Sequence, residues 1–567
     1  MSEFGNIVDE FLSRYHKLDA KVEDRQHEDE RAIISLNLSN IFRKFVQPVH
    51  FILISAKYLE HLKATRPREI IKPVLEGLDR KDWAGLVPIL ISGPGQVTPA
   101  VEFAKEAFIA REYPILKADA FLRRDAAEKL IKTIFLDNVS IERLSPYAIG
   151  TAASSTMFYG RESILKQLLQ KTGNVFIFGP RRIGKSSLAF QFREQSGYIK
   201  QVSGSSARLQ SIPRCSYVDV STVVYHSTNA IWQAILRGFG LKRQDFAAAG
   251  RYADWSASRH ELRNAPIDEA KALRHFLSKH SGKLTIMLDE VDGWIQRDAA
   301  NRWRGFDLLR SITDVGQVQL ILIGYESLAL AERSYSFPLH GRGELVSLPP
   351  LTRRDTEQLI LEPINELEIA LYSERQVVER IWIESKGMPS IVQDICGRLV
   401  RDMFNKGSDE RRVLAHDLTV AMAHSDALRR YQTGTLNTGY PLAEAIAGIT
   451  SFEDEDLEEV RKQQAPVPAL IGSIGPVHST SDILKVLEAA GYTYDEEEFD
   501  LALMNLELRY ILRMDLNGNY WYWINKGARK KAVARILGIG IERWIASKMR
   551  KFKEGDWRAM YEELGYF

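Results

Sequence analysis

The chain has 567 residues, which is too long for one hydrophobic core and indicates about three or four domains. Its 45% hydrophobic and 26% charged residues are typical of soluble globular proteins. A formal net charge of +2 excludes a general electrostatic attraction to nucleic acid, so any basic contact surface has to be local.

The two cysteines, Cys215 and Cys396, lie far apart and lack metal-ligand spacing, which favours buried thiols in a reducing compartment and argues against a metalloenzyme. We find no signal-peptide pattern, and the apolar run at residues 49–54 is too short to span a bilayer. The sequence therefore predicts a cytoplasmic protein without a transmembrane segment.

Residues 1–144 alternate charged and apolar side chains at helical spacing, with prolines between the repeats. This pattern predicts several amphipathic helices and hence an all-α N-terminal module. No catalytic constellation is visible in this stretch. We interpret it as an accessory module for a protein partner, an oligomer contact or sensing.

A linker marked by Ser145, Pro146 and Gly150 leads to the segment FYGRE at residues 158–162 and then to a helical pattern, ILKQLL. Aromatic side chains next to a glycine are also compatible with a plain turn that links two domains. Taken alone, the segment predicts only a boundary between the N-terminal module and a second domain.

Residues 175–190, VFIFGPRRIGKSSLAF, read as a buried strand, a loop and the start of a helix. The loop contains the pattern GxxxxGK[ST] within residues 179–187, which is typical of a phosphate-binding loop. Glycine is needed at 179 and 184 because the backbone must curl with its N–H groups toward phosphate oxygens. The helix N-terminus favours the same anion, Lys185 would contact the β- and γ-phosphates, and Ser186 would ligate Mg²⁺.

A further strand at residues 215–221 precedes a helix near 231–239, and residues 283–290 then read KLTIMLDE. An apolar strand ending in two adjacent acids is the Walker B arrangement. Asp289 would hold the Mg²⁺ shell, and Glu290 would orient or deprotonate the attacking water. Asp292 follows in the same DEVD sequence and can serve as a cap of the next helix.

The sequence GMP follows further along, at Gly387, Met388 and Pro389. In content and order, the whole series of motifs resembles that of the STAND and archaeal-ATPase-type P-loop NTPases, which are relatives of the AAA+ and origin-recognition ATPases. The resemblance covers residues 145–400 and implies that Tyr147, Phe158, Gly160 and Arg161 line the adenine and ribose side of the pocket. It implies that Pro389 packs by the nucleotide in a helical lid, although a simple helix-breaking Gly and Pro pair is also possible. The nucleotide-binding residues expected from motif and resemblance together are Gly179, Pro180, Arg181, Arg182, Ile183, Gly184, Lys185, Ser186, Ser187, Tyr147, Phe158, Gly160, Arg161 and Pro389.

The strand expected at residues 318–324 stands where related ATPases place a polar sensor of the γ-phosphate, but Tyr325, Glu326 and Ser327 follow it instead of Asn or Thr. Arg342 stands where relatives can carry an arginine finger for a neighbouring subunit, and a surface ion pair is the alternative. ATP is favoured over GTP because no NKxD pattern follows Walker B. The absence of LSGGQ argues against an ABC-type ATPase.

Residues 482–524 predict two helices and two strands joined at Asn517-Gly518, an order that resembles a winged helix. The candidate recognition helix begins with four acids at 495–498, which would repel phosphates, so a protein contact or an autoinhibitory role is favoured. The tail from Lys526 to Lys553 is basic and could contact nucleic acid, although a solvated helix face packed on the wing is favoured.

The sequence as a whole predicts a multidomain α/β protein with an AAA+/STAND-like P-loop NTPase core. We expect an N-terminal helical module at 1–144, the ATPase core at 145–350, a helical lid at 351–430, and a winged helix with a basic tail at 431–567. The expected function is an ATP-hydrolysing switch that uses ATP and Mg²⁺, with self-association and a protein partner contacted through the N-terminal module or the winged helix. The alternatives are an ATP-dependent DNA-binding factor and a nucleotide-stabilised scaffold with negligible turnover.

Overall fold

The computed structural model describes most of the chain, in segments separated by gaps. The chain folds into two compact units. The first unit comprises residues 1–158, 357–378 and 393–424, and the second comprises 159–356, 379–392 and 425–567. The described residues are 3–26, 30–45, 47–76, 78, 86–92, 98–111, 113–122, 127–139, 141–148, 152–203, 208–223, 228–241, 269–278, 283–314, 318–405, 411–434, 438–463, 465–476, 478–514, 519–522 and 526–555.

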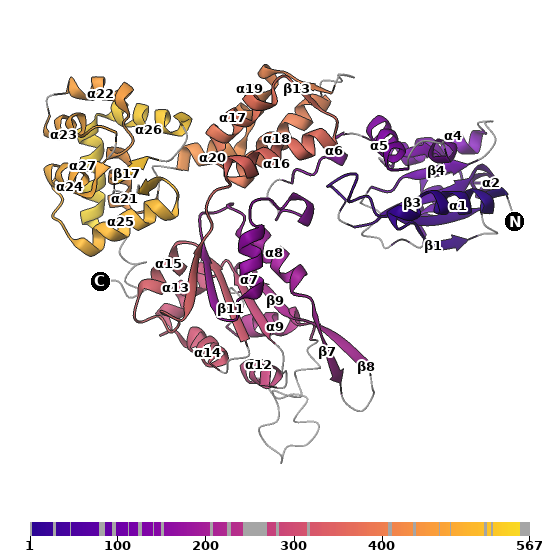
Figure 1. The fold of residues 1–567 in the computed structure, drawn as a ribbon, viewed down its shortest axis with the longest axis horizontal. Helices are drawn as coiled ribbons and strands as arrows, with labels where there is room; N and C mark the ends of the chain where they lie inside the picture. Colours follow the sequence, from indigo (N-terminus) through magenta and orange to yellow (C-terminus); the bar gives the residue numbers. More distant parts are fainter. Residues whose placement is uncertain are drawn as a thin grey trace, which may run out of the picture. The chain divides into compact units, whose positions relative to one another are not determined.

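The first unit contains a five-stranded sheet in the order β1-β2-β3-β4-β5 (Figure 1). Strand β2 runs antiparallel to β1 and β3, whereas β3, β4 and β5 run parallel. The strands are β1 (Lys21–Gln26), β2 (Arg31–Leu36), β3 (Val49–Ser55), β4 (Ile89–Ser92) and β5 (Ile115–Lys117), and the helices are α1 (Glu3–Arg14), α2 (Ala56–His61), α3 (Pro67–Val74), α4 (Pro99–Ile109), α5 (Ala127–Asn138) and α6 (Ile141–Leu144).

The prediction of an all-α N-terminal module is therefore wrong. Residues 49–61, which lie within the stretch that we expected to be helical, form strand β3 followed directly by helix α2. A short run of β-branched and aromatic side chains fits a buried strand as well as a helix, and hydrophobic periodicity cannot separate the two. Five of the seven residues of β3 are buried, so this run pairs in the interior of a sheet.

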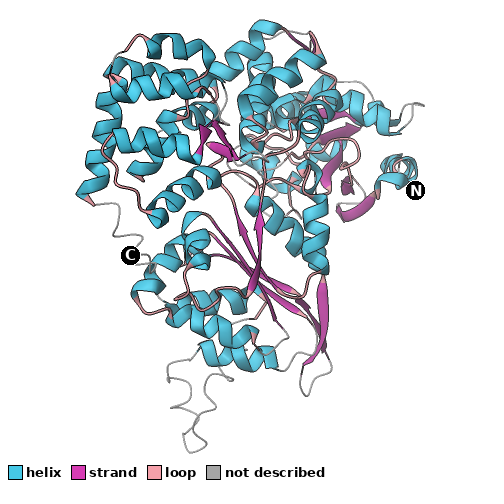
Figure 2. Cartoon of the chain, turned by 60° about the vertical axis from the view of Figure 1, so that its left-hand side comes forward, coloured by secondary structure: helices cyan, strands magenta, loops and turns pink. Residues whose placement is uncertain are grey.

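The second unit is built on a five-stranded parallel sheet in the order β12-β6-β11-β10-β9, with helices packed along its strands (Figure 2). Strand β11 thus lies between the strands that precede the two predicted nucleotide motifs. The strands are β6 (Asn174–Phe178), β9 (Cys215–Asp219), β10 (Leu284–Asp289), β11 (Val318–Gly324) and β12 (Gly343–Ser347), and the helices are α7 (Glu162–Gln170), α8 (Lys185–Ser196), α9 (Thr228–Gly238), α12 (Glu269–Ser278), α13 (Asp292–Ala300), α14 (Arg304–Thr313) and α15 (Glu326–Arg333). A separate two-stranded ribbon, β7 (Tyr198–Ser203) with β8 (Arg208–Pro213), follows α8.

A group of helices follows the core in sequence and contributes segments to both units. These are α16 (Arg353–Glu366), α17 (Glu374–Ser385), α18 (Pro389–Asn405), α19 (Ala415–His424) and α20 (Asp426–Gly434), with the short strands β13 (Ala370–Leu371) and β14 (Arg412–Val413) between them. The division into four domains expected from the sequence stays a prediction.

The C-terminal part of the second unit has the expected order of two helices, α24 and α25, and two antiparallel strands, β16 and β17. The predicted turn at Asn517-Gly518 lies outside the described residues. Buried residues of the parallel sheet and of these helices belong to one hydrophobic cluster. The elements are α21 (Pro441–Ile449), α22 (Asp454–Arg461), α23 (Pro466–Ile474), β15 (His478–Ser479), α24 (Thr480–Ala489), α25 (Glu496–Leu508), β16 (Leu512–Met514), β17 (Asn519–Tyr522), α26 (Lys526–Ile539) and α27 (Ile541–Glu554). Among the described residues, we find no helix with the length and apolar character needed to cross a bilayer.

His478 in β15 makes the stability of this part of the chain depend on pH. Its side chain is fully buried, neither ring nitrogen has a hydrogen-bond partner among the described residues, and burial lowers its pKa to about 4 despite the opposing charge of Asp482. Below pH 6.5, His478 therefore binds a proton more readily in the unfolded chain than in the folded protein. The free energy of unfolding decreases as the pH falls from 6.5 toward 4. We expect a loss of about 2 kcal/mol between pH 7 and pH 5. Urea unfolding of wild type and His478→Leu at both values tests this, since the variant lacks this part of the pH dependence.

Candidate functional site

The predicted phosphate loop joins strand β6 to helix α8, as the motif requires. Gly184, the residue directly before helix α8, has a φ angle of +103°. This left-handed conformation favours glycine. The first turn of α8 therefore begins directly after the loop, and its N–H groups have no partner within the helix. A helix N-terminus of this kind attracts anions.

Lys185 is the first residue of α8 and lies over the loop. Its Nζ atom donates hydrogen bonds to the carbonyl oxygens of Gly179 (2.7 Å) and Pro180 (3.1 Å). The side chain is buried, and this burial lowers the pKa of the ammonium group, whereas the carboxylates of Glu290, Asp292 and Asp289 oppose the shift. A desolvated cation is therefore held at the anion-binding end of the helix.

The second predicted motif lies beside this lysine. Asp289 ends strand β10, is 1% exposed, and accepts hydrogen bonds from the Tyr217 hydroxyl (2.9 Å) and the Glu290 amide (2.9 Å). Burial raises the pKa of Asp289, and hydrogen bonds from the Ser186 and Tyr217 side chains oppose the shift. The structure thus brings together Ser186 and Asp289, the two residues proposed from sequence to hold Mg²⁺. Glu290 follows with an exposed side chain and φ +54°, a strained conformation for a residue other than glycine.

Asp292 has a different role from the one considered from sequence. Although it begins α13, its carboxylate accepts hydrogen bonds from the amides of Tyr325 (2.7 Å) and Ser327 (2.8 Å), so it caps helix α15. This helix follows β11 in the chain, and sequence offers no signal for the contact. The cap fixes the residues that follow β11 next to the two motifs.

A cavity of about 480 Å³ opens between these elements. Three arginines and three acids are among its lining residues, and most of the apolar lining comes from segments late in the chain. Sequence reasoning missed Arg430, Tyr431, Arg509 and Ile511, because nothing in the local sequence places the middle of α20 and the residues after α25 near a loop at residue 180. The lining residues are Pro180, Arg181, Glu290, Asp292, Gln296, Tyr325, Glu326, Ser327, Met388, Arg430, Tyr431, Arg509 and Ile511.

The remaining loop residues differ in exposure. Arg181 and Arg182 are exposed, whereas the side chain of Ile183 is fully buried. Arg181 also lines the cavity. Ser187, in the first turn of α8, is partly buried. Only some members of the loop motif therefore face the cavity.

The residues assigned by resemblance to the adenine side are divided between the two units. Tyr147 and Phe158 belong to the first unit, where the Tyr147 hydroxyl donates to the carbonyl of Ile360 (2.9 Å). Gly160 and Arg161 belong to the second, where the buried Arg161 guanidinium donates to the carbonyl of Pro349. The role of these residues in binding the adenine and ribose of a nucleotide stays a prediction.

Arg342 does not lie with the two motifs. It precedes β12, and Gly343 pairs with Asn174 at the beginning of β6, whereas the phosphate loop follows the other end of β6. Its guanidinium forms an ion pair with Asp314. Arg342 therefore lies near the amino-terminal ends of these strands, whereas the phosphate loop follows the carboxyl end of β6. Its role as an arginine finger toward another subunit stays a prediction.

Pro389 is the first residue of α18 and follows a tight turn at Gly387. Gly387 has φ +74°, and a Cβ atom there would lie 2.2 Å from the carbonyl oxygen of Leu351. We expect Gly387→Ala to destabilise the second unit by at least about 2 kcal/mol. Thermal unfolding measures this, with Gly293→Ala as the control because a Cβ atom at that position meets no atom within 4 Å. Equal melting temperatures for the two variants would contradict the expectation.

A glycine-rich loop between a parallel strand and a helix, facing an acid pair at the end of another strand, defines a P-loop NTPase fold. Residues 168–330 match the family model described as an AAA domain, so this part of the chain is a P-loop domain of the AAA class. The match covers less than half of the chain.

Solved structures with detectable similarity are remote. They include the Walker-type ATPase of Pyrococcus abyssi, with 16% identity, 68% of this chain and 99% of that chain covered, and a TM-score of 0.40. The ORC2 protein of Aeropyrum pernix has 14% identity, with 69% and 95% covered and a TM-score of 0.40. For RuvB of Thermotoga maritima the identity is 14%, with 66% and 95% covered and a TM-score of 0.31. These values carry no argument about function. No curated protein matches the chain.

Proposed function

We propose that the protein binds and hydrolyses ATP and acts as a molecular switch of the AAA+/STAND type, in which the nucleotide state controls conformation, assembly or partner binding. The observation that carries this proposal is the meeting of Lys185 and Ser186 with Asp289 and Glu290 at the carboxyl ends of β6 and β10. A buried lysine at a helix N-terminus next to two carboxylates suits a phosphate chain neutralised by a divalent cation.

Each side chain has a distinct role in this proposal. Lys185 and the first-turn amides of α8 bind the phosphates. Ser186 and Asp289 hold Mg²⁺, which neutralises charge on the phosphate oxygens when it is bound, and the influence of Ser186 on the pKa of Asp289 fits this pairing. Glu290 orients the attacking water and accepts its proton, which its exposed position at the cavity permits.

The surrounding elements would transmit the nucleotide state. Residues 351–430, with the turn from Gly387 to Pro389, are the proposed lid, and Met388 lines the cavity. Helices α24 and α25 with strands β15 to β17 are the proposed winged helix. The N-terminal sheet module is proposed to contact a partner or a second copy of the chain. Each change of nucleotide would then alter how these parts engage.

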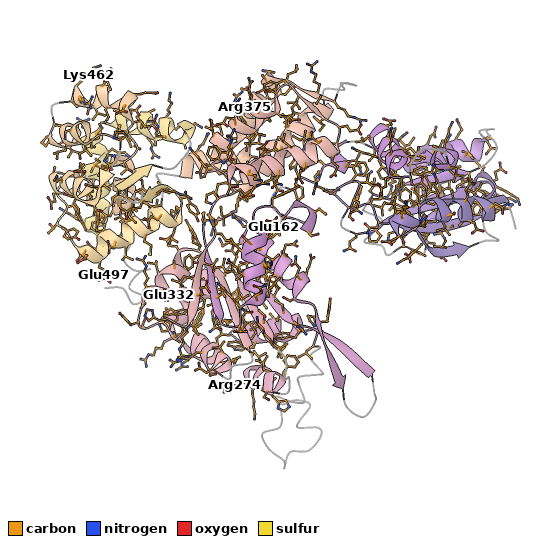
Figure 3. The ribbon with its side chains drawn as sticks, viewed as in Figure 1. Glu162, Arg274, Glu332, Arg375, Lys462 and Glu497 are labelled. Atoms are coloured by element: carbon orange, nitrogen blue, oxygen red, sulfur yellow. The ribbon has the colours of Figure 1, made fainter. Side chains whose placement is uncertain are left out.

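A DNA-binding factor is the second candidate, and contacts of the basic tail count against it. Arg529 in α26 is buried and paired with Glu453 and Asp456, and Lys548 in α27 is paired with Glu444. The first turn of α25 is acidic, and Glu497 there is exposed (Figure 3). Among the described residues of the tail, the exposed cations that could support nucleic-acid binding are Lys530, Lys531 and Arg535 on α26 and Arg543, Arg550, Lys551 and Lys553 on α27.

Titration of a fluorescent ATP analogue and measurement of phosphate release with Mg²⁺ test the ATPase proposal. We expect saturable binding and slow turnover. The absence of binding would overturn the proposal, and binding without turnover would leave the scaffold alternative.

Particle size with a slowly hydrolysed ATP analogue and with ADP tests the switch, because a nucleotide-dependent change of assembly is the expected result. DNA binding that decreases with salt and is lost on removal of residues 526–553 would favour the second candidate.

A further inference from the structure

Tyr325 lines the cavity, and its ring has two cations close to it. The Lys185 Nζ atom lies 5.7 Å from the centroid of the Tyr325 ring, and the Arg509 guanidinium carbon lies 5.5 Å from the same centroid. Cations at these distances are attracted by the electron-rich face of an aromatic ring. The ring thus links a cation of the phosphate loop to a cation from residue 509, at the end of α25.

Arg509 is held in this place by fixed acceptors. Its Nη2 atom donates to the Glu326 carboxylate at 2.8 Å and to the carbonyl of Thr438 at 2.9 Å. Glu326 also accepts a hydrogen bond from the Asn505 side chain, one turn earlier in α25. The Arg509 and Glu326 side chains are 24% and 14% exposed, so the pair is shielded from much of the screening by solvent. The guanidinium therefore has a defined position at the cavity.

The end of strand β11 explains why a cation from elsewhere is needed. The residues after β11 are Tyr325, Glu326 and Ser327, and the Ser327 hydroxyl accepts a hydrogen bond from Gln296 (3.0 Å). Asp292 fixes this segment by capping α15. Tyr325 lines the cavity, and burial raises the pKa of its hydroxyl, so the side chain stays neutral. The segment itself therefore presents no cation to a phosphate group.

From this arrangement we infer that Arg509 distinguishes nucleoside triphosphates from diphosphates, and that Glu326 is the residue that positions it. The inference rests on the proposed function, because it assigns a phosphate to the cavity next to Lys185. A triphosphate carries more negative charge than a diphosphate, and a second, partly buried cation that lines the cavity responds to that difference. Arginine suits this role because it binds phosphate oxygens through two N–H groups at once.

The test compares Arg509→Gln with wild type in binding a slowly hydrolysed ATP analogue and ADP. We expect the affinity for the triphosphate analogue to fall 10- to 100-fold and the affinity for ADP to change less than threefold. Glu326→Gln keeps the shape of the positioning residue and removes its charge, so it is expected to lower the triphosphate preference by a smaller factor. Arg509→Lys keeps the charge and is expected to recover part of the preference, which a purely structural role would not predict.

Arg543→Gln is the matched control, because it removes an exposed arginine of the same unit on α27, outside the residues that line the cavity. It is expected to bind both nucleotides as wild type does. The inference is wrong if Arg509→Gln keeps the wild-type preference, or if it loses affinity for both nucleotides equally. If Arg509→Gln fails to fold, Glu326→Gln decides, and an unchanged preference in that variant overturns the inference. Failure of the wild-type protein to bind either nucleotide would instead overturn the proposed function.

Discussion

Lys185→Ala is expected to weaken ATP binding at least 100-fold, which corresponds to about 3 kcal/mol. Lys185 is the cation nearest the start of α8, and its ammonium group is already desolvated, so its attraction for phosphate is little screened. Alanine leaves the helix N-terminus and the loop backbone in place but removes this charge. Titration of a fluorescent ATP analogue measures the loss directly.

The Lys185→Ala variant is expected to remain folded. The ammonium group donates to two loop carbonyls, and the desolvation cost lost with this buried cation offsets part of the attraction that the carboxylates of Asp289 and Asp292 lose. A suitable control is Lys166→Ala, because Lys166 is an exposed cation on α7 in the same unit. If Lys185→Ala bound ATP as tightly as wild type while remaining folded, the assignment of the phosphate loop would be wrong.

The phosphate loop and the acid pair could be predicted because each depends on a short continuous stretch. Residues 174–196 form strand β6, the loop and helix α8 in the order that the sequence indicated. Glycine at 184 is required by a local backbone conformation, and the first of the two acids ends a strand whose residues are all buried. Such local requirements restrict which residues can occur at each position, so they can be recognised from the sequence alone.

The N-terminal sheet could not be predicted for the opposite reason. The run at residues 49–55 has the composition of either a buried helix segment or a strand, and its state depends on pairing with β2 and β4. Pairing partners separated by a variable length of chain leave no periodic signal. Arg31 in β2 illustrates the difficulty, because this charged residue is fully buried and donates to the carbonyl of Val74 (2.9 Å).

The part of the cavity lining that comes from late in the chain is the other part that sequence missed. Arg509 reaches Tyr325 because α25 packs against the end of β11, through contacts between residues more than 170 positions apart. The role of Asp292 has the same origin, since its carboxylate caps a helix that begins after the next strand of the sheet. Motif reasoning identifies the parts of a site made by one segment, whereas the tertiary packing of distant segments decides what completes it.

Glu290→Gln is expected to leave ATP affinity within about threefold of wild type and to lower the rate of phosphate release by 10²- to 10⁴-fold. The substitution keeps the shape of the side chain but removes the base that accepts a proton from the attacking water. Partial desolvation raises the pKa of Glu290, with Lys185 opposing and Asp289 and Asp292 adding to the shift, so this carboxylate is a better proton acceptor than an ordinary glutamate. ATP binding depends on Lys185 and the helix N-terminus, which the substitution does not touch.

The Glu290→Gln variant should therefore accumulate in the ATP-bound state, and its particle size with ATP should equal that of wild type with a slowly hydrolysed analogue. Single-turnover phosphate release and light scattering measure the two effects on the same sample. Glu162→Gln serves as the control because Glu162 is an exposed carboxylate at the start of α7, outside the residues that line the cavity (Figure 3). Wild-type turnover in Glu290→Gln would show that another group activates the water, and a parallel loss of ATP binding would show that Glu290 acts on the ground state instead.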